Sequence, residues 1–158
     1  MKKMAVGLLK GLFFLGIGFY LGGKMLAGMI NDYKTKMNRN LVNMLLLNDW
    51  LGFLYSGGRV EQYFQKRNYH KIMIYGSSYV GARLAQALAD TDVEVVALMD
   101  KVAPSDADGL IIGADAEIPE SDCIVVTPVF YYEEIYDMLR ARTDIPIVSM
   151  QTIISCEL

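Results

Sequence analysis

The most constraining feature of the sequence is a strand, a glycine turn, a helix and a second strand in close succession. Lys71–Tyr75 (KIMIY) is a short β-rich apolar run that stops at Gly76, and Tyr79–Asp90 then carries apolar residues at helical spacing. Val93–Met99 (VEVVALM) is the next apolar run. Together they have the length of a βαβ unit, about 30 residues, whose crossover helix makes the two strands pair in parallel.

The residues that follow extend this unit into a larger parallel sheet. Three further apolar runs predict strands at Gly109–Gly113, Cys123–Thr127 and Ile145–Met150, and Val129–Ala141 has the spacing of a helix. The predicted fold class is α/β, a half-Rossmann sheet of four or five parallel strands in the order 3-2-1-4-5. Ligands of such sheets bind at the carboxyl ends of the strands where the order reverses, here between the first and fourth strands.

The turn after the first strand resembles the dinucleotide-binding pattern G-x-G-x-x-G. Gly76 and Gly81 match its first and third glycines, and Ser78 occupies the position of the second. In the pattern, that second glycine lets a pyrophosphate approach the backbone. Asp100 ends the second strand, where a carboxylate accepts hydrogen bonds from an unphosphorylated ribose, as in NAD. The predicted cofactor-binding residues are Gly76, Ser77, Ser78, Tyr79, Gly81, Asp100, Thr127 and Pro128. The alternative is that the two glycines only shape the turn and Asp100 only caps a loop.

The amino-terminal segment predicts a membrane anchor. From Met4 to Ile30 every residue is apolar, Gly or Tyr except Lys10 and Lys24. With both lysines snorkelling, about 40 Å of helix covers a hydrocarbon layer of about 30 Å. We therefore expect a single-pass protein of the cytoplasmic membrane, anchored by residues 1–30, with its carboxyl-terminal domain in the cytoplasm because basic residues follow the span. A cleaved signal peptide and a helix lying on the membrane surface are the alternatives.

Four glycines of this segment share one stripe of a helix. Gly7, Gly11, Gly18 and Gly22 are spaced by four, seven and four positions and form two GxxxG units. Such units let two helices approach closely, which predicts a homodimer. Glycine is also common in membrane helices for other reasons, and that interpretation stays open.

A helical adaptor is predicted between the anchor and the α/β domain. No proline precedes Pro104, so the first helix is expected to continue to Tyr55, where Ser56-Gly57-Gly58 ends it. A second short helix is expected at Arg59–Lys66. The predicted domains are the anchor (1–30), the adaptor (31–68) and the nucleotide-binding domain (69–158). Apolar residues at three-and-four spacing predict the packing face of the adaptor helix: Met37, Leu41, Met44, Leu45 and Leu51.

Charge and cysteine content exclude several functions. Residues 1–70 carry ten Lys or Arg against three acids, whereas residues 71–158 carry five against fifteen. An acidic folded half argues against a nucleic-acid partner, and a basic apolar half suits an anionic membrane surface. Cys123 and Cys156 are the only cysteines, so neither a disulfide framework nor a zinc site is expected.

Three segments carry a resemblance to a known group: KIMIYGSSYVGARLAQAL...VEVVALMDK, DCIVVTPVFYYEEI and PIVSMQTII. Over about Tyr63–Ile154 the chain resembles the nucleotide-binding domain of bacterial sugar acyltransferases and capsular polysaccharide proteins. The resemblance implies that the glycine turn binds NAD or the nucleotide part of a nucleotide sugar. It also implies an accessory role in polysaccharide or cell-envelope synthesis, with membrane-bound polysaccharide enzymes as partners. No hexapeptide-repeat catalytic domain follows, so acyl transfer is not expected.

A non-catalytic binding module is therefore predicted. His70 is the only histidine and precedes the first strand, at the edge opposite the expected cleft, so no histidine base is expected there. From Lys71 onward the chain has the length of one mononucleotide-binding half, without a substrate domain. The alternative from another class is a membrane-tethered structural or dimerising adaptor with an empty cleft.

Overall fold

The computed structural model describes the backbone of residues 2–101 and 110–156, and the surroundings of side chains from residue 15 onward in those ranges. Two compact units divide the chain, Met1–Leu41 and Val42–Leu158. The elements are, in chain order, α1 (Lys2–Tyr55), α2 (Val60–Gln65), β1 (Lys71–Tyr75), α3 (Tyr79–Leu88), β2 (Glu94–Asp100), β3 (Ile111–Gly113), β4 (Cys123–Val126), the 3-10 turn η1 (Val129–Tyr131), α4 (Tyr132–Arg140), β5 (Ile147–Ser149) and α5 (Met150–Ser155).

The second unit contains a five-stranded sheet in the order β3-β2-β1-β4-β5. All four neighbouring pairs are parallel, and β1 at the centre pairs with both β2 and β4. The sequence prediction of an α/β fold with this strand order is confirmed. Gly109, the first residue of the predicted third strand, lies outside the described residues.

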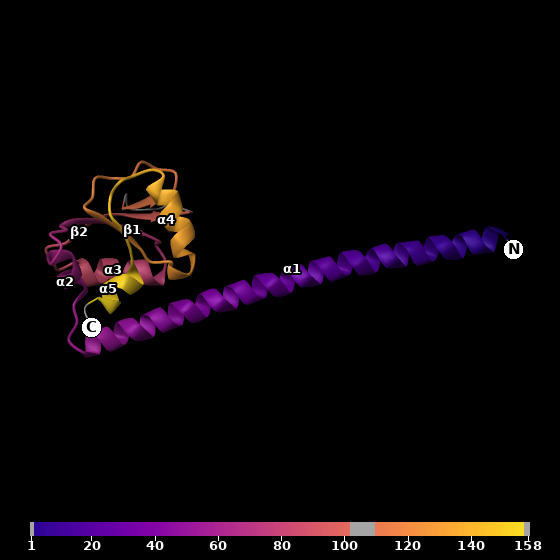
Figure 1. Cartoon of the computed structure of the whole chain (residues 1–158), viewed down its shortest axis with the longest axis horizontal. Helices are drawn as coiled ribbons and strands as arrows, with labels where there is room; N and C mark the ends of the chain where they lie inside the picture. The colour runs from indigo at the N-terminus through magenta and orange to yellow at the C-terminus, as the bar shows by residue number, and fades with distance from the viewer. Residues whose placement is uncertain (1, 102–109, 157–158) are drawn as a thin grey trace. The chain divides into compact units, whose positions relative to one another are not determined.

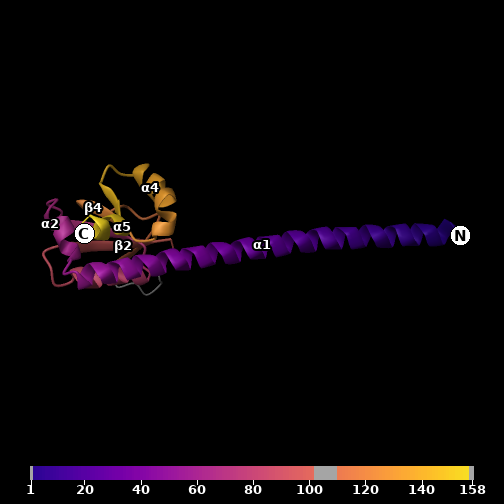
Figure 2. The same cartoon turned by 60° about the horizontal axis from the view of Figure 1, so that its bottom comes forward.

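Each face of the sheet has its own apolar core. Ile72 and Ile74 of β1 face α2, α3, α5 and the end of α1, whereas Met73 and Tyr75 face α4. This alternation follows from the two-residue period of a strand. Figure 1 shows α4 on one side of the strands and α3 with α5 on the other, and the turned view in Figure 2 shows α2 beside α5. Because both faces are covered, the strands are apolar throughout rather than alternating.

The end of α1 uses a different packing face from the predicted one. Leu46, Trp50 and Phe53 are buried in the core, whereas Met44 and Leu45 remain exposed. The predicted stripe is not the one that packs on the sheet, because apolar residues surround much of this helix and two stripes both satisfy three-and-four spacing. Only the position of the sheet determines which stripe is covered.

The predicted end of α1 is confirmed. The helix ends at Tyr55, and Gly57 adopts a φ of +86°, which favours glycine. The amide of Gly58 donates to the carbonyl oxygen of Phe53 at 2.9 Å and closes the last turn. In the short helix α2 that follows, Tyr63 and Phe64 are buried, as expected of a segment packed on the sheet.

The predicted membrane anchor is overturned. Between residues 15 and 101 and between residues 110 and 156, no helix is both long enough and apolar enough to cross a membrane. Among the described residues, the charged side chains of Lys24, Asp32, Lys34 and Lys36 interrupt the apolar character of α1. The prediction of a single-pass protein of the cytoplasmic membrane depended on this anchor and is therefore not supported.

The glycine stripe remains an untested prediction. An ideal Cβ atom at Gly18 or Gly22 would meet nothing within 4 Å. Gly7 and Gly11 precede the residues whose surroundings the structure describes.

The carboxyl-terminal segment forms a helix that the sequence prediction had treated as a tail. Ser149 is the N-cap of α5, and its hydroxyl oxygen accepts a hydrogen bond from the amide of Thr152 at 3.0 Å. Met150, Ile153 and Ile154 are buried beneath it. The strand predicted to extend to Met150 therefore stops at Ser149, because the capping serine begins a helix there.

We expect the two cysteines to react very differently with thiol reagents. Burial raises the pKa of the Cys123 thiol to about 12, whereas Cys156 is exposed after α5. Iodoacetamide should therefore modify Cys156 in the native protein at pH 8 and reach Cys123 only after unfolding, as measured by peptide mass spectrometry. A Cys156→Ser variant should show almost no native labelling, and equal labelling rates of the two thiols would contradict this prediction.

Candidate functional site

The turn between β1 and α3 is closely packed against the end of β4. Gly76 has a φ of +103°, and its amide donates to the carbonyl oxygen of Met99 at 2.7 Å. An ideal Cβ atom at Gly76 would lie 2.6 Å from Thr127 Oγ1 and 2.8 Å from Pro128 Cδ. Glycine is thus required for both its backbone conformation and the space available. The structure brings together the predicted site residues of the first and fourth strands.

Asp100 binds the turn directly. Its Oδ2 atom accepts hydrogen bonds from the amide of Ser77 at 2.8 Å and from Ser77 Oγ at 2.7 Å. The glycine turn and the end of β2 therefore lie side by side, and Asp100 joins them within the protein. A ribose hydroxyl that approaches Asp100 would have to share this oxygen with Ser77 or replace it.

Gly81 allows α3 to lie unusually close to β1. An ideal Cβ atom there would fall 1.8 Å from the carbonyl oxygen of Gly76 and 3.4 Å from Ile74 Cγ2. This is the role of the third glycine of the dinucleotide-binding pattern, close packing of helix against strand. The match at Gly81 is thus explained by packing, whatever the turn binds.

The first turn of α3 faces the same edge of the sheet. Ser78 is the N-cap, in an extended conformation (φ −72°, ψ −168°), and its side chain makes no capping hydrogen bond. The first amide groups of a helix have no partner within the helix and attract anions. Tyr79, the first helical residue, has a side chain that is 85% exposed.

Thr127 has a structural role in this arrangement. Its side chain is buried, and its hydroxyl group can donate to either of two backbone carbonyl oxygens. Oγ1 lies 3.1 Å from the oxygen of Tyr75 and 3.2 Å from that of Gly76. Its amide also donates to the Tyr75 oxygen at 3.0 Å. The hydroxyl therefore ties β4 to the turn and is engaged before any ligand arrives.

Tyr75 belongs to this site, although sequence reasoning missed it. It is the last residue of β1, is 3% exposed, and its hydroxyl has no hydrogen-bond partner among the described residues. Burial raises the pKa of Tyr75, the carboxylates of Asp100 and Glu134 raise it further, and Arg142 opposes them. The available signal was a tyrosine ending an otherwise aliphatic strand directly before the glycine turn. Its phenol is thus an unpaired donor in the electrostatic field of Asp100.

Aromatic residues that follow β4 line a separate hollow. A hollow of about 460 Å³ lies after the carboxyl ends of β4 and β5, with Ser149 and Gln151 on one side. Phe130 and Tyr131 pack edge to face there, with their ring centroids 4.9 Å apart. The remaining residues around the hollow are Val129, Tyr132, Glu133 and Glu134.

His70 lies at the amino end of β1, as expected, away from the glycine turn. The amides of His70 and Lys71 donate to Asp122 Oδ2 at 2.7 and 2.8 Å. These two bonds hold the pKa of the Asp122 carboxyl below its usual range. His70 therefore lies where Asp122 links the start of β1 to the start of β4, and it is not part of the candidate site.

Metal ligands do not gather in the part of the chain that the structure describes. Among residues 15–101 and 110–156, no group of three or more His, Cys, Asp or Glu side chains has an arrangement that could hold a metal ion.

Comparison with known proteins gives one finding. A family model described as "C2185-like, N-terminal" matches residues 68–153, which is more than half of the chain. No curated protein and no solved structure matches the chain. The resemblance to sugar acyltransferases and capsular polysaccharide proteins is therefore wrong. It rested on a glycine turn and a strand pattern that many unrelated parallel sheets share.

Proposed function

The chain belongs to the C2185-like N-terminal family, and from the geometry of its glycine turn we propose that the α/β domain is a nucleotide-binding module. The ligand we propose is NAD or another nucleotide with an unphosphorylated ribose. Its phosphate would lie at the first turn of α3 and its ribose hydroxyls at Asp100. The observation that carries the proposal is the placement of Asp100 at the end of β2, beside the glycine turn and where the strand order reverses.

Three features of the described residues support this proposal. The turn lies at the carboxyl end of β1, between β1 and β4, where the strand order reverses. The amides of the first turn of α3 are donors without helical partners, suited to phosphate. Asp100 is the last residue of β2 and lies beside this turn, the position at which a carboxylate accepts hydrogen bonds from a ribose.

Binding in this position implies an exchange of hydrogen bonds. Ser77 Oγ, which donates to Asp100 at 2.7 Å, would be released to a phosphate oxygen. Asp100 Oδ2 would then accept from a ribose hydroxyl. The exchange keeps the number of charge-assisted bonds at the carboxylate nearly constant, so its free-energy cost is small.

The proposal is tested by adding nucleotides to the full chain and measuring the melting temperature and the heat of binding. At a ligand concentration of 100 Kd, binding adds about 2.7 kcal/mol to the free energy of unfolding, which shifts the melting temperature by several degrees. We expect a larger shift with NAD than with NADP, because a 2′-phosphate would face the Asp100 carboxylate. Asp100→Asn should reduce the affinity at least about tenfold.

The matched control is Asp144→Asn. Asp144 is fully exposed and lies in the α4–β5 connection, so its replacement should leave any nucleotide affinity unchanged. A well-folded protein that responds to none of NAD, NADP, ATP and a set of UDP, GDP and CMP sugars would contradict the proposal.

A second candidate is a structural adaptor in which the turn holds no ligand. The two bonds from Ser77 to Asp100 favour it, together with the Thr127 hydroxyl that is engaged by backbone oxygens. In that case Asp100→Asn lowers the melting temperature of the free protein, and no nucleotide raises that of the wild type.

A further inference from the structure

The second half of α1 carries an apolar stripe in addition to the face that is buried on the sheet. Eight positions follow one another at alternating spacings of three and four residues, the seven-residue repeat of a coiled coil. The repeat extends over about 36 Å of helix. Its first half is Ile30, Tyr33, Met37 and Asn40, and its second half is Met44, Leu47, Leu51 and Leu54. We call these eight residues the heptad seam.

The heptad seam is exposed, and it is separate from the residues of α1 that pack in the core. Six of its seven apolar side chains are between 48% and 69% exposed, and Asn40 is exposed as well. The core residues Leu46, Trp50 and Phe53 each precede a seam residue by one position. Neighbouring residues of a helix point about 100° apart. The sheet therefore covers one face of α1, and the seam lies on another.

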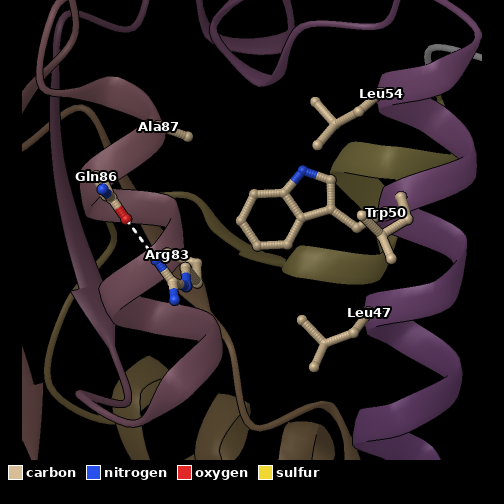
Figure 3. A pocket seen from close by; sticks show the side chains of 7 residues that line it. Leu47, Trp50, Leu54, Arg83, Gln86 and Ala87 are labelled. Atoms are coloured by element: carbon tan, nitrogen blue, oxygen red, sulfur yellow. Dashed lines mark hydrogen bonds between the residues drawn. The ribbon is translucent and has the colours of Figure 1, made fainter.

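The carboxyl-terminal end of the heptad seam borders a hollow of the second unit. A groove of about 440 Å³ lies between the last turns of α1 and α3. Figure 3 shows Leu47 and Leu54 on the α1 side of this groove and Ala87 on the α3 side. Side chains of an added helix thus have space beside the seam, as the interlocking packing of a coiled coil requires.

The seven-residue period fits another helix as the partner. A straight helix drifts by about 20° per heptad relative to an exact seven-residue repeat, so the seam stays in contact only with a helix that winds around it. Charged residues flank such seams in coiled coils, and Lys34 and Lys36 do so here. Lys36 forms an ion pair with Asp32 of its own helix at 2.8 Å, so its charge is compensated beside the seam.

Asn40 indicates the identity and the direction of the partner helix. It is the single polar residue of the heptad seam, and burying an amide without a hydrogen-bond partner costs about 1–3 kcal/mol. In a parallel pair in register, Asn40 meets the same residue of a second copy, and the two amides can bond to each other. In an antiparallel pair it would face a methionine, because its seam neighbours on both sides are Met37 and Met44.

We propose that α1 forms a parallel two-stranded coiled coil with α1 of a second copy of this chain, through the heptad seam. A single polar residue within an apolar seam specifies the register of such a pair at some cost in stability. Each α/β domain keeps its own core, because Leu46, Trp50 and Phe53 are not part of the seam. The proposal depends neither on nucleotide binding nor on the glycine stripe.

Sedimentation equilibrium of the full chain over a range of protein concentrations tests the association. We expect a dimer, and Met37→Glu or Met44→Glu should raise its dissociation constant at least about tenfold, because each would bury two facing carboxylates. Both methionines are exposed, so these variants should fold as the wild type does, as measured by circular dichroism and the melting temperature. Leu45→Glu is the matched control, since Leu45 is half exposed on the same helix outside the seam.

A disulfide test establishes the direction of the two helices. In a Cys156→Ser background, Asn40→Cys should link two copies when oxidised glutathione is added, because equivalent seam positions face each other in a parallel pair. The product is measured on a non-reducing gel. Asn38→Cys, an exposed asparagine position outside the seam, is the matched control and should form no such link.

Several results would overturn the proposal. They are a monomer at every concentration, a complex of three or more copies, equal effects of Leu45→Glu and Met44→Glu, and equal linking at positions 38 and 40. Gly18→Leu separates the heptad seam from the glycine stripe. A dimer that Gly18→Leu abolishes and Met44→Glu leaves intact would belong to the stripe, and the heptad seam would then not be the interface.

Discussion

Gly81→Ala is expected to lower the free energy of unfolding by about 3 kcal/mol or more, the upper range for overpacking a core. The new Cβ atom would lie 1.8 Å from the carbonyl oxygen of Gly76, a backbone atom that cannot rotate away. Helix α3 would have to move off β1, loosening the contacts of Val80 and Leu84 with the sheet. The melting temperature should fall by on the order of 10 °C in a calorimetric scan.

The same substitution at Gly52 is the control. Gly52 lies in α1, and an ideal Cβ atom there meets nothing within 4 Å. Gly52→Ala should therefore stabilise the protein by about 0.5–1 kcal/mol, the helix-propensity difference between the two residues. A Gly81→Ala protein as stable as the wild type would show that α3 does not lie this close to β1.

Phe53→Ala is expected to have the second large effect, a loss of about 3–5 kcal/mol on urea unfolding. The Phe53 ring is 1% exposed and packs against Gly58, where an ideal Cβ atom would lie 2.3 Å from Phe53 Cε2. Removing the ring would leave a cavity where the last turns of α1 meet the core. The loss would show that this segment is an integral part of the α/β unit.

Leu45→Ala tests the other stripe of the same helix. Leu45 is half exposed, so its truncation should change the free energy of unfolding by no more than about 0.5 kcal/mol. A larger loss at Leu45 than at Phe53 would mean that the face predicted from the apolar spacing is the one that packs.

The candidate site could be predicted only in part. Gly76 and Gly81 stand out in the sequence because a short strand, two glycines and a helix follow one another within a few residues. The bonds between Ser77 and Asp100 could not be predicted, because they join side-chain and backbone atoms 23 positions apart. The engagement of the Thr127 hydroxyl by the oxygens of Tyr75 and Gly76 was likewise invisible. Both depend on atomic distances across strands.

Trp50 shows the same limit. A tryptophan among leucines near a helix end is typical of a core residue, and the sequence contains no sign that its Nε1–H lacks a partner. That property depends on which side chains surround the indole in the folded protein. Similarly, the apolar character of residues 4–30 predicted a membrane anchor, whereas no helix among the described residues is both long and apolar enough to cross a membrane.

The sequence by itself determined the strands, the helices between them and the order of the sheet. These follow from local periodicity and from the rule that parallel strands joined by a helix cross over in one hand. Only the tertiary structure decided which face of α1 is buried and what Asp100 binds. Each of these depends on side chains far apart in the sequence that meet across packed elements, and a local pattern does not encode those distances.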